Sequence, residues 1–176
     1  MSLIRDLVNN EEMEYISGKF TSESLFNGEM NIGIFSGSEV ASDYADKCIM
    51  HCNSLKNNEK ICEQLQEKLE KFFLYMYDEW KEMDIYDDIV ADNEKVMEEY
   101  KAGRKLVEFL SDPTLYIYPP QGDEIGYCIE CECPWEPEHQ CIIVIRGDKV
   151  MYVGPSEGED PWGDEDDYYC IWEDED

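Results

Sequence analysis

The sequence predicts a single α+β domain, in which an N-terminal β-hairpin is followed by three helices and then by a small antiparallel sheet packed against the helices. The period of the apolar residues predicts this order, because it is near two at the start, three to four in the middle, and near two again from residue 115 onward. The length of 176 residues suits one domain with its own core. We therefore expect residues 1–176 to form one domain, with an acidic C-terminal segment, residues 156–176, that is partly docked.

The hairpin is predicted by two apolar stretches around a turn sequence. Residues 20–26 are followed by Asn27-Gly28, and then Met30, Ile32 and Ile34 alternate with small or polar residues. Asn-Gly is typical of a tight two-residue hairpin turn. The sequence therefore predicts that the chain reverses at Asn27-Gly28.

Two amphipathic helices are predicted next. Apolar residues recur at helical spacing over residues 41–55, after Ser38 as a candidate N-cap. Lys56-Asn57-Asn58 is expected to break this helix. A second stripe over residues 62–80 gives the strongest helical pattern in the chain.

A third helix is predicted from Val96 to Leu110. It is expected to end before Asp112-Pro113, because a proline disfavours the helical conformation of the residue that precedes it. Gly103 lies in the middle of this stretch and weakens it.

The late sheet is predicted by four apolar stretches that are rich in β-branched and aromatic residues. These are residues 115–118, 125–135, 141–145 and 150–153. The sequence Arg146-Gly147-Asp148-Lys149 separates the last two and suits a hairpin turn. A small antiparallel sheet covered by the helices is the expected packing.

The charge of the chain restricts its partners. The sequence has 43 acidic and 14 basic side chains, and its formal net charge is -29. Such a protein repels nucleic acid and anionic membranes, whereas it attracts a cationic protein over a long range. Because no long apolar run and no secretory signal pattern is present, we expect a cytoplasmic protein without bound cofactors.

The eight cysteines allow a zinc site as an alternative. Thiolates of Cys131, Cys133 and Cys141, together with the imidazole of His139, are the ligand types that zinc prefers. Against this, residues 127–135 are expected to form a strand in which Cys128 points away from Cys131. Buried free thiols in a reducing compartment are the favoured interpretation.

Glu138 and His139 could form a general-base pair if they lined a pocket, which would make the protein hydrolytic. Adjacent residues rarely converge on one substrate atom, and both residues lie in a connection between strands. A structural role for His139 in the turn is therefore favoured.

The stretch from Trp135 to His139, followed by two strands and Val153-Gly154-Pro155, resembles a family of uncharacterised bacterial domains with a Trp-x-x-Glu-His-Gly signature. Trp135, Glu138 and His139 match the signature, whereas Gln140 stands where the family has glycine. Glutamine resists the positive φ that glycine adopts readily. The resemblance implies no activity, but similar small acidic proteins occur among immunity proteins that neutralise bacterial toxins.

We expect a non-enzymatic acidic binding protein, such as an immunity protein that neutralises a cationic toxin. Carboxylates would steer the partner and aromatic side chains would anchor it. The expected partner-binding residues are Asp160, Trp162, Asp164, Asp166, Asp167, Tyr168, Tyr169 and Trp172. A nucleic-acid mimic is a further alternative, because spaced carboxylates can imitate a phosphate backbone.

Overall fold

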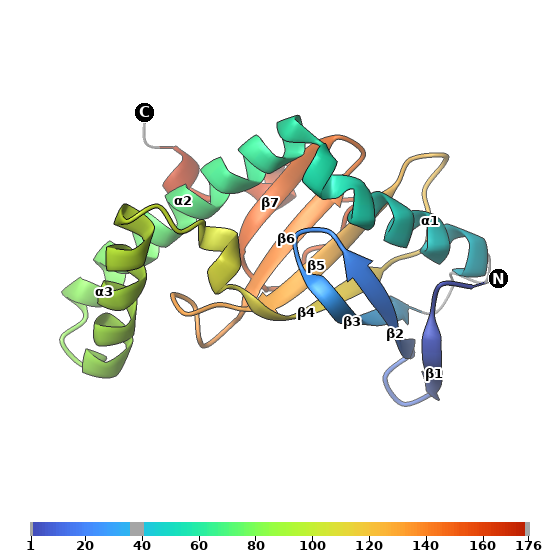
Figure 1. Ribbon diagram of the computed structural model, residues 1–176, viewed down its shortest axis with the longest axis horizontal. Helices are drawn as coiled ribbons and strands as arrows, with labels where there is room; N and C mark the ends of the chain where they lie inside the picture. The colour runs from blue at the N-terminus through green and yellow to red at the C-terminus, as the bar shows by residue number, and fades with distance from the viewer. Residues whose placement is uncertain (1, 36–40, 175–176) are drawn as a thin grey trace.

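The computed structural model describes residues 2–35 and 41–174, and over these ranges it contains three α-helices and seven β-strands in a mixed α+β fold (Figure 1). The strands are β1 (Arg5–Asn10), β2 (Tyr15–Glu23), β3 (Asn27–Phe35), β4 (Ser111–Ile117), β5 (Gly126–Glu132), β6 (Cys141–Arg146) and β7 (Lys149–Pro155). The helices are α1 (Ala41–Ser54), α2 (Glu59–Glu82) and α3 (Asp87–Lys101). Short 3-10 turns cover Leu55–Asn57, Leu106–Phe109, Glu165–Tyr168 and Ile171–Glu173.

All seven strands form one sheet, in the order β1-β2-β3-β4-β5-β6-β7. Neighbouring strands are antiparallel except β3 and β4, which are parallel. The three helices connect these two strands, and a parallel pair needs such a long crossover. The expectation of a small antiparallel sheet is therefore only partly met: β4 to β7 are antiparallel, but they form one larger sheet with β1 to β3, because period-two patterns identify strands and do not show which edges pair.

The predicted hairpin is present, but its turn lies earlier than expected. β2 and β3 pair from Tyr15 with Phe35 to Glu23 with Asn27, so residues 24–26 form the turn. Gly28 lies within β3 and has a φ of 110°, a conformation that glycine adopts readily because it has no Cβ. The edge strand β1 was not predicted, because its sequence does not alternate and none of its side chains is buried.

The helix break predicted at Lys56-Asn57-Asn58 is confirmed. α1 passes into a 3-10 turn, and the Asn58 side chain then accepts a hydrogen bond from the Ile61 amide at 3.2 Å. Asn58 is thus the N-cap of α2, which satisfies one of the free amides at the start of the helix. The predicted N-cap of α1, Ser38, lies outside the described residues.

The third helix lies earlier in the chain than expected, because α3 begins at Asp87 rather than at Val96. It ends at Lys101, and Gly103 follows with a φ of 103°. A glycine in the left-handed region is a common helix terminator, so Gly103 ends the helix that we expected it only to weaken. Leu106–Phe109 forms a 3-10 turn, and the prediction of one helix as far as Leu110 is wrong.

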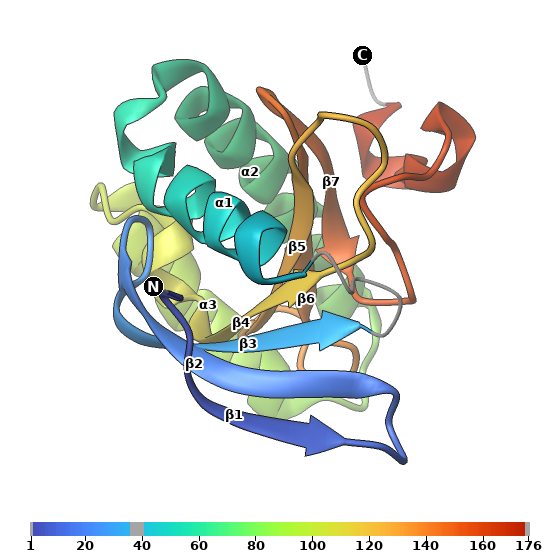
Figure 2. The same ribbon diagram turned by 90° about the vertical axis from the view of Figure 1, so that its right-hand side faces the viewer.

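The sheet separates two apolar layers. α1 and α2 cover one face, and the C-terminal residues lie against the other beside β7 (Figure 2). Successive side chains along a strand point to opposite faces of the sheet. In β5, Tyr127, Ile129 and Cys131 therefore belong to the helix-side core, whereas Cys128 belongs to the smaller core on the far side. The prediction that Cys128 and Cys131 point apart is confirmed. The far side of β5 to β7 therefore needs a cover, which the C-terminal segment supplies.

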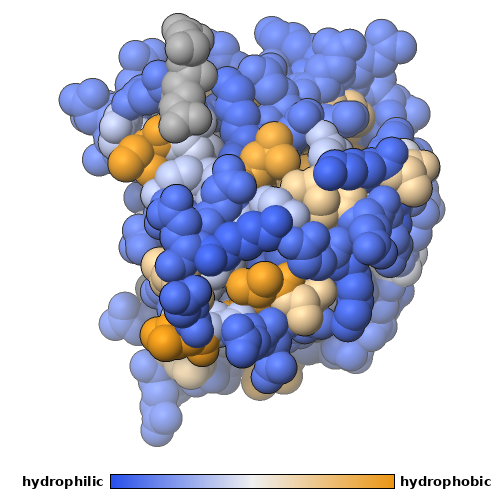
Figure 3. Space-filling model, turned by 90° about the vertical axis from the view of Figure 1, so that its left-hand side faces the viewer, coloured by the Kyte–Doolittle hydropathy of each residue, from blue (hydrophilic) through white to orange (hydrophobic). Residues whose placement is uncertain are grey.

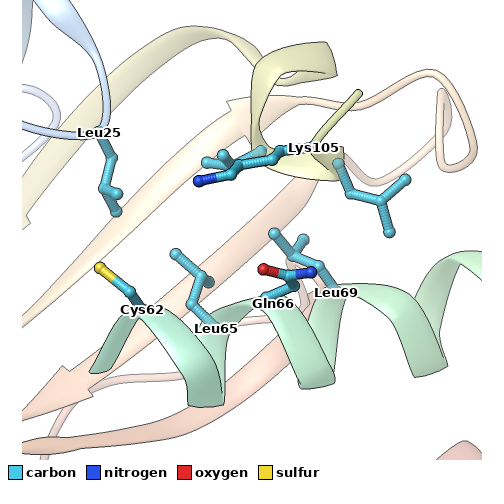
Figure 4. Close-up of a pocket in the computed structure, with 8 residues that line it drawn as sticks. Leu25, Cys62, Leu65, Gln66, Leu69 and Lys105 are labelled. Carbon is cyan, nitrogen blue, oxygen red and sulfur yellow. The ribbon is translucent and has the colours of Figure 1, made fainter. Parts of the chain in front are cut away.

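A small apolar cavity lies between α2, the β2–β3 turn and the 3-10 turn after α3 (Figure 4). Leu65 and Leu69 project into it from α2, and the side chain of Lys105 extends across it. Its volume is about 80 Å³. Cofactor and ligand pockets occupy about 300–1,000 Å³, so this cavity is a packing gap.

On the face drawn in Figure 3, hydrophilic side chains predominate and surround small, separate hydrophobic patches. Among the residues that the structure describes, no helix combines the length and the apolar character needed to cross a membrane.

Candidate functional site

The C-terminal segment is held on the far face of the sheet by Tyr168. Its side chain is buried, with 5% of the residue exposed. The hydroxyl donates a hydrogen bond to the Asp160 carbonyl at 2.6 Å and accepts one from the Gly163 amide at 2.8 Å. Burial raises the pKa of Tyr168, so the hydroxyl keeps the proton that it donates.

Arg146, at the end of β6, fastens the same segment to the sheet. Its Nε donates to the Pro161 carbonyl at 2.6 Å, and its Nη2 donates to the Gly163 carbonyl at 2.7 Å and to the Tyr168 hydroxyl at 3.1 Å. A guanidinium can make these bonds together because its donors form a rigid planar fork. Its charge is thus directed to backbone carbonyls and a hydroxyl.

The expected aromatic anchors have different surroundings. Trp162 is half-buried and donates from Nε1 to the Pro119 carbonyl at 2.9 Å. Trp172 is also half-buried and packs against Phe72, with 5.0 Å between ring centroids. By contrast, Tyr169 is 63% exposed. Of the four aromatic residues, Tyr168, Trp162 and Trp172 therefore pack within the protein, and Tyr169 projects into solvent.

One apolar residue of this region was missed by sequence reasoning. Ile171 is 56% exposed, close in sequence to Tyr169. The sequence suggests that Tyr168, Cys170 and Trp172 point one way and that Tyr169 and Ile171 point the other. It does not reveal which of these two sets faces the protein interior.

The carboxylates of residues 160–167 are exposed and make no ion pair in the described part of the chain, whereas Glu173 pairs with Lys68. Arg146 and Lys149 are the only basic residues after position 118. Within residues 2–35 and 41–174, no basic nitrogen lies within 4.0 Å of a carboxylate oxygen in the stretch 157–167. We call the exposed side chains of Asp160, Asp164, Glu165, Asp166, Asp167, Tyr169 and Ile171 the C-terminal acidic surface.

A second candidate region is the connection between β5 and β6, residues 133–140, which we call the signature turn. Trp135 anchors it in the core, where it is fully buried and its ring lies 5.1 Å from Phe73 between centroids. The Trp135 carbonyl accepts a hydrogen bond from Trp80 Nε1 at 2.9 Å. The turn is therefore fixed to α2 by both the side chain and the backbone of one residue.

The carboxylate that meets His139 is Glu136 rather than Glu138. Glu136 Oε1 accepts a hydrogen bond from the His139 amide at 3.1 Å, and His139 Nδ1 lies at hydrogen-bond distance from the same oxygen, also 3.1 Å. Glu136 is buried, whereas Glu138 and His139 are exposed. The i to i+3 spacing of a turn, which brings Glu136 over His139, could have suggested this pair in the sequence.

The thiols expected as zinc ligands lie together without the histidine. Cys131 faces Cys141 across β5 and β6, and Cys133 lies further along the same side. Burial raises the pKa of the Cys131 and Cys133 thiols well above the usual value. His139 is at the surface, and the described part of the chain contains no group of three or more His, Cys, Asp or Glu side chains arranged to hold a metal ion.

Gln140 adopts the backbone conformation that favours glycine. Its φ is 65°, at the end of the signature turn. The turn thus has left-handed geometry at this position, and the glutamine adopts it despite its Cβ. Such a conformation costs a residue with a side chain about 1–2 kcal/mol.

Replacing Gln140 with glycine should stabilise the protein. Relief of the left-handed strain exceeds the extra entropy of glycine in the unfolded chain, and we expect the free energy of unfolding to rise by about 0.5–1 kcal/mol. Urea denaturation measures this. The matched control is Gln121→Gly, an exposed loop position without positive φ, which should lower stability. Equal destabilisation by both substitutions would contradict the strain at Gln140.

The comparisons with known proteins identify one family. The model of a family described as "Domain of unknown function (DUF6985)" matches residues 7–161. The match includes all three helices and the signature turn, and it ends before Trp162. No curated protein and no solved structure matches the chain. Because the family model covers most of the chain, this protein belongs to the DUF6985 family of domains of unknown function.

Proposed function

We propose that this protein is a non-enzymatic binding protein that captures a cationic protein through the C-terminal acidic surface. We further propose that it acts in the bacterial cytoplasm as an immunity protein, by covering a basic toxin. The observation that carries the proposal is a run of exposed carboxylates, residues 160–167, that are in no ion pair within the described ranges and whose backbone is held on the sheet by Arg146, with the exposed Tyr169 and Ile171 following in sequence.

The charge supports the first step of binding, the encounter. A net charge of -29 accelerates association with a positive partner, and the effect weakens as salt screens the field. The carboxylates of the C-terminal acidic surface contribute directly because, among the described residues, none of them is in an ion pair.

Rigidity and apolar side chains support the second step, the retention of the partner. Arg146 and Tyr168 fix the backbone of the segment in the free protein, so little conformational entropy is lost on binding. Tyr169 and Ile171 supply exposed apolar area close in sequence to these carboxylates, and aromatic and apolar anchors of this kind are typical of interface hot spots.

Association kinetics test the proposal, with a basic ribonuclease and the product of the gene adjacent to its own as probes. We expect the association rate constant to fall about tenfold between 0.05 and 0.5 M salt for at least one of them. In the triple variant Asp164→Asn, Glu165→Gln and Asp166→Asn, the rate constant at low salt should fall severalfold. Binding that does not depend on salt, or no binding to either probe, would contradict the proposal.

The matched control carries the same change of charge elsewhere. Glu11, Glu12 and Glu14 are exposed in the β1–β2 turn, and their replacement with glutamine should change the rate constant much less. A separate Tyr169→Ala variant should increase the dissociation rate constant about tenfold with little change in association. If both triple variants have equal effects, total charge rather than this surface attracts the partner.

A further inference from the structure

A surface cavity lies beside the signature turn, and none of its lining residues belongs to the C-terminal acidic surface. It is formed where β4 begins, β5 ends and the turn leads to β6, and its volume is about 380 Å³. The residues that line it are Ser111, Glu132, Cys133, Pro134, Glu136, Pro137 and Gln140. The volume is within the range of about 300–1,000 Å³ that is usual for ligand pockets.

Glu136 gives this cavity a buried carboxylate with one oxygen free. Only 4% of the residue is exposed. Oε1 accepts both hydrogen bonds from His139, whereas Oε2 has no hydrogen-bond or ionic partner among the residues that the structure describes. A buried carboxylate is costly unless donors surround it. Oε2 is not among the fully buried atoms that lack a partner, so it is a free acceptor accessible from the cavity.

The other groups around the cavity favour a positive donor. Glu132 also lines it, is exposed, and is in no ion pair within the described ranges. No Lys, Arg or His is among the lining residues. Burial raises the pKa of the Cys133 thiol well above its usual value, so this side chain stays neutral and brings no second charge.

The walls of the cavity are preorganised. Pro134 and Pro137 restrict the backbone on either side of Glu136, and the Glu136 amide donates to the Cys133 carbonyl at 3.1 Å. Trp135, packed between them and the core, prevents the turn from collapsing into the cavity. The free carboxylate oxygen is thus held in place before any ligand arrives.

We propose that this cavity binds the guanidinium group of an arginine side chain. The planar fork can donate to Glu136 Oε2 and to Glu132 at once, and the Gln140 side chain can accept a further bond. The inference rests on the proposed function for the source of the arginine, which is the basic partner protein. It adds a specific pocket to a protein whose acidic surface attracts the partner only by general charge.

Blocked tripeptides test the pocket directly. We expect Gly-Arg-Gly to shift the amide NMR resonances of residues 132–140 saturably. The citrulline peptide, which has nearly the same shape but no charge, should bind at least about tenfold more weakly. Gly-Lys-Gly should also bind more weakly, because an ammonium cannot bridge the two carboxylates in the same way. Equal binding of the citrulline or the lysine peptide would overturn the assignment to arginine.

Substitutions within the same turn provide the matched control. Glu136→Gln keeps an acceptor for the His139 amide but loses the charge, and it should weaken the arginine peptide about tenfold or more. Glu138→Gln removes an equal charge from an exposed residue that does not line the cavity, and affinity should stay within about twofold. Glu132→Gln should have an intermediate effect. Equal effects at positions 136 and 138 would mean that the overall negative charge of the turn, rather than the pocket, attracts the peptide.

The outcome is separable from that of the proposed function. The triple variant of Asp164, Glu165 and Asp166 should bind the arginine peptide as the natural protein does. If the peptide does not bind but salt-dependent capture of a basic protein persists, the pocket fails and the acidic surface remains. If the peptide binds but no basic protein is captured, the proposed function fails and the pocket remains.

Discussion

The free energy of unfolding should fall by about 3–5 kcal/mol when Trp135 is replaced with alanine. The ring is fully buried and packs edge to face against Phe72 and Phe73, so its removal leaves a cavity lined by rigid aromatic groups that cannot close it. Domains of this size have about 5–15 kcal/mol of stability, and the loss is a large part of it. Urea denaturation followed by far-ultraviolet circular dichroism measures the change without depending on tryptophan fluorescence.

Two further variants test the reason for this loss. Trp135→Phe keeps an aromatic ring and removes the Trp135 Nε1 group, which is buried without a hydrogen-bond partner, so it should cost much less than alanine. Tyr169→Ala removes an exposed ring and should change stability by no more than about 0.5 kcal/mol. A loss below 1 kcal/mol in Trp135→Ala would be inconsistent with the packing described above.

Replacing Arg146 with methionine should release the C-terminal segment while the rest of the sheet stays folded. The substitution removes three hydrogen bonds from a charged donor, to Pro161, Gly163 and Tyr168. Because part of this loss is recovered by water, we expect a local destabilisation of about 2–3 kcal/mol. Hydrogen exchange of peptides from residues 156–174 should then accelerate about 30-fold or more.

The control for this variant is Lys149→Met, which lies three residues away on the other side of the same hairpin turn and changes the charge equally. Lys149 is exposed and pairs with Arg146 across the turn without contacting the segment through any ion pair in the described ranges. Its replacement should leave exchange in residues 156–174 within about twofold. Equal acceleration in both variants would assign the effect to net charge and contradict the hydrogen-bond geometry. Arg146→Lys should give an intermediate result, because an ammonium lacks the planar fork.

The Arg146 variant also connects the structure with the proposed function. If the segment must be fixed in order to retain a partner, Arg146→Met should increase the dissociation rate constant, even though the variant is more acidic. Electrostatic steering alone predicts the opposite tendency, because a more negative protein attracts a cationic partner more strongly. The direction in which binding by Arg146→Met changes therefore shows whether rigidity or charge has the larger effect.

The sequence by itself determined the elements whose pattern is local. The 3.6-residue period of α2, the break at Asn58 and the turn at Gly147-Asp148 all depend on neighbouring residues, and the structure has them as predicted. The same holds for the opposite directions of Cys128 and Cys131, because side chains in a strand must alternate. Gly103 was also identified in the sequence, but the sequence does not show its positive φ, so the predicted end of the third helix was wrong.

Only the tertiary structure decided which of these elements meet. The parallel pairing of β3 with β4 joins segments that are separated by all three helices, and no local pattern encodes it. Likewise, the sequence contained Glu136, Glu138 and His139, but the fold of the turn decided that Glu136 is buried against His139 beside a cavity. Tyr168 turned inward and Tyr169 outward for the same reason, since burial depends on which surface remains uncovered once the sheet has formed. Contacts between distant residues arise from packing, which the order of residues along the chain constrains only weakly.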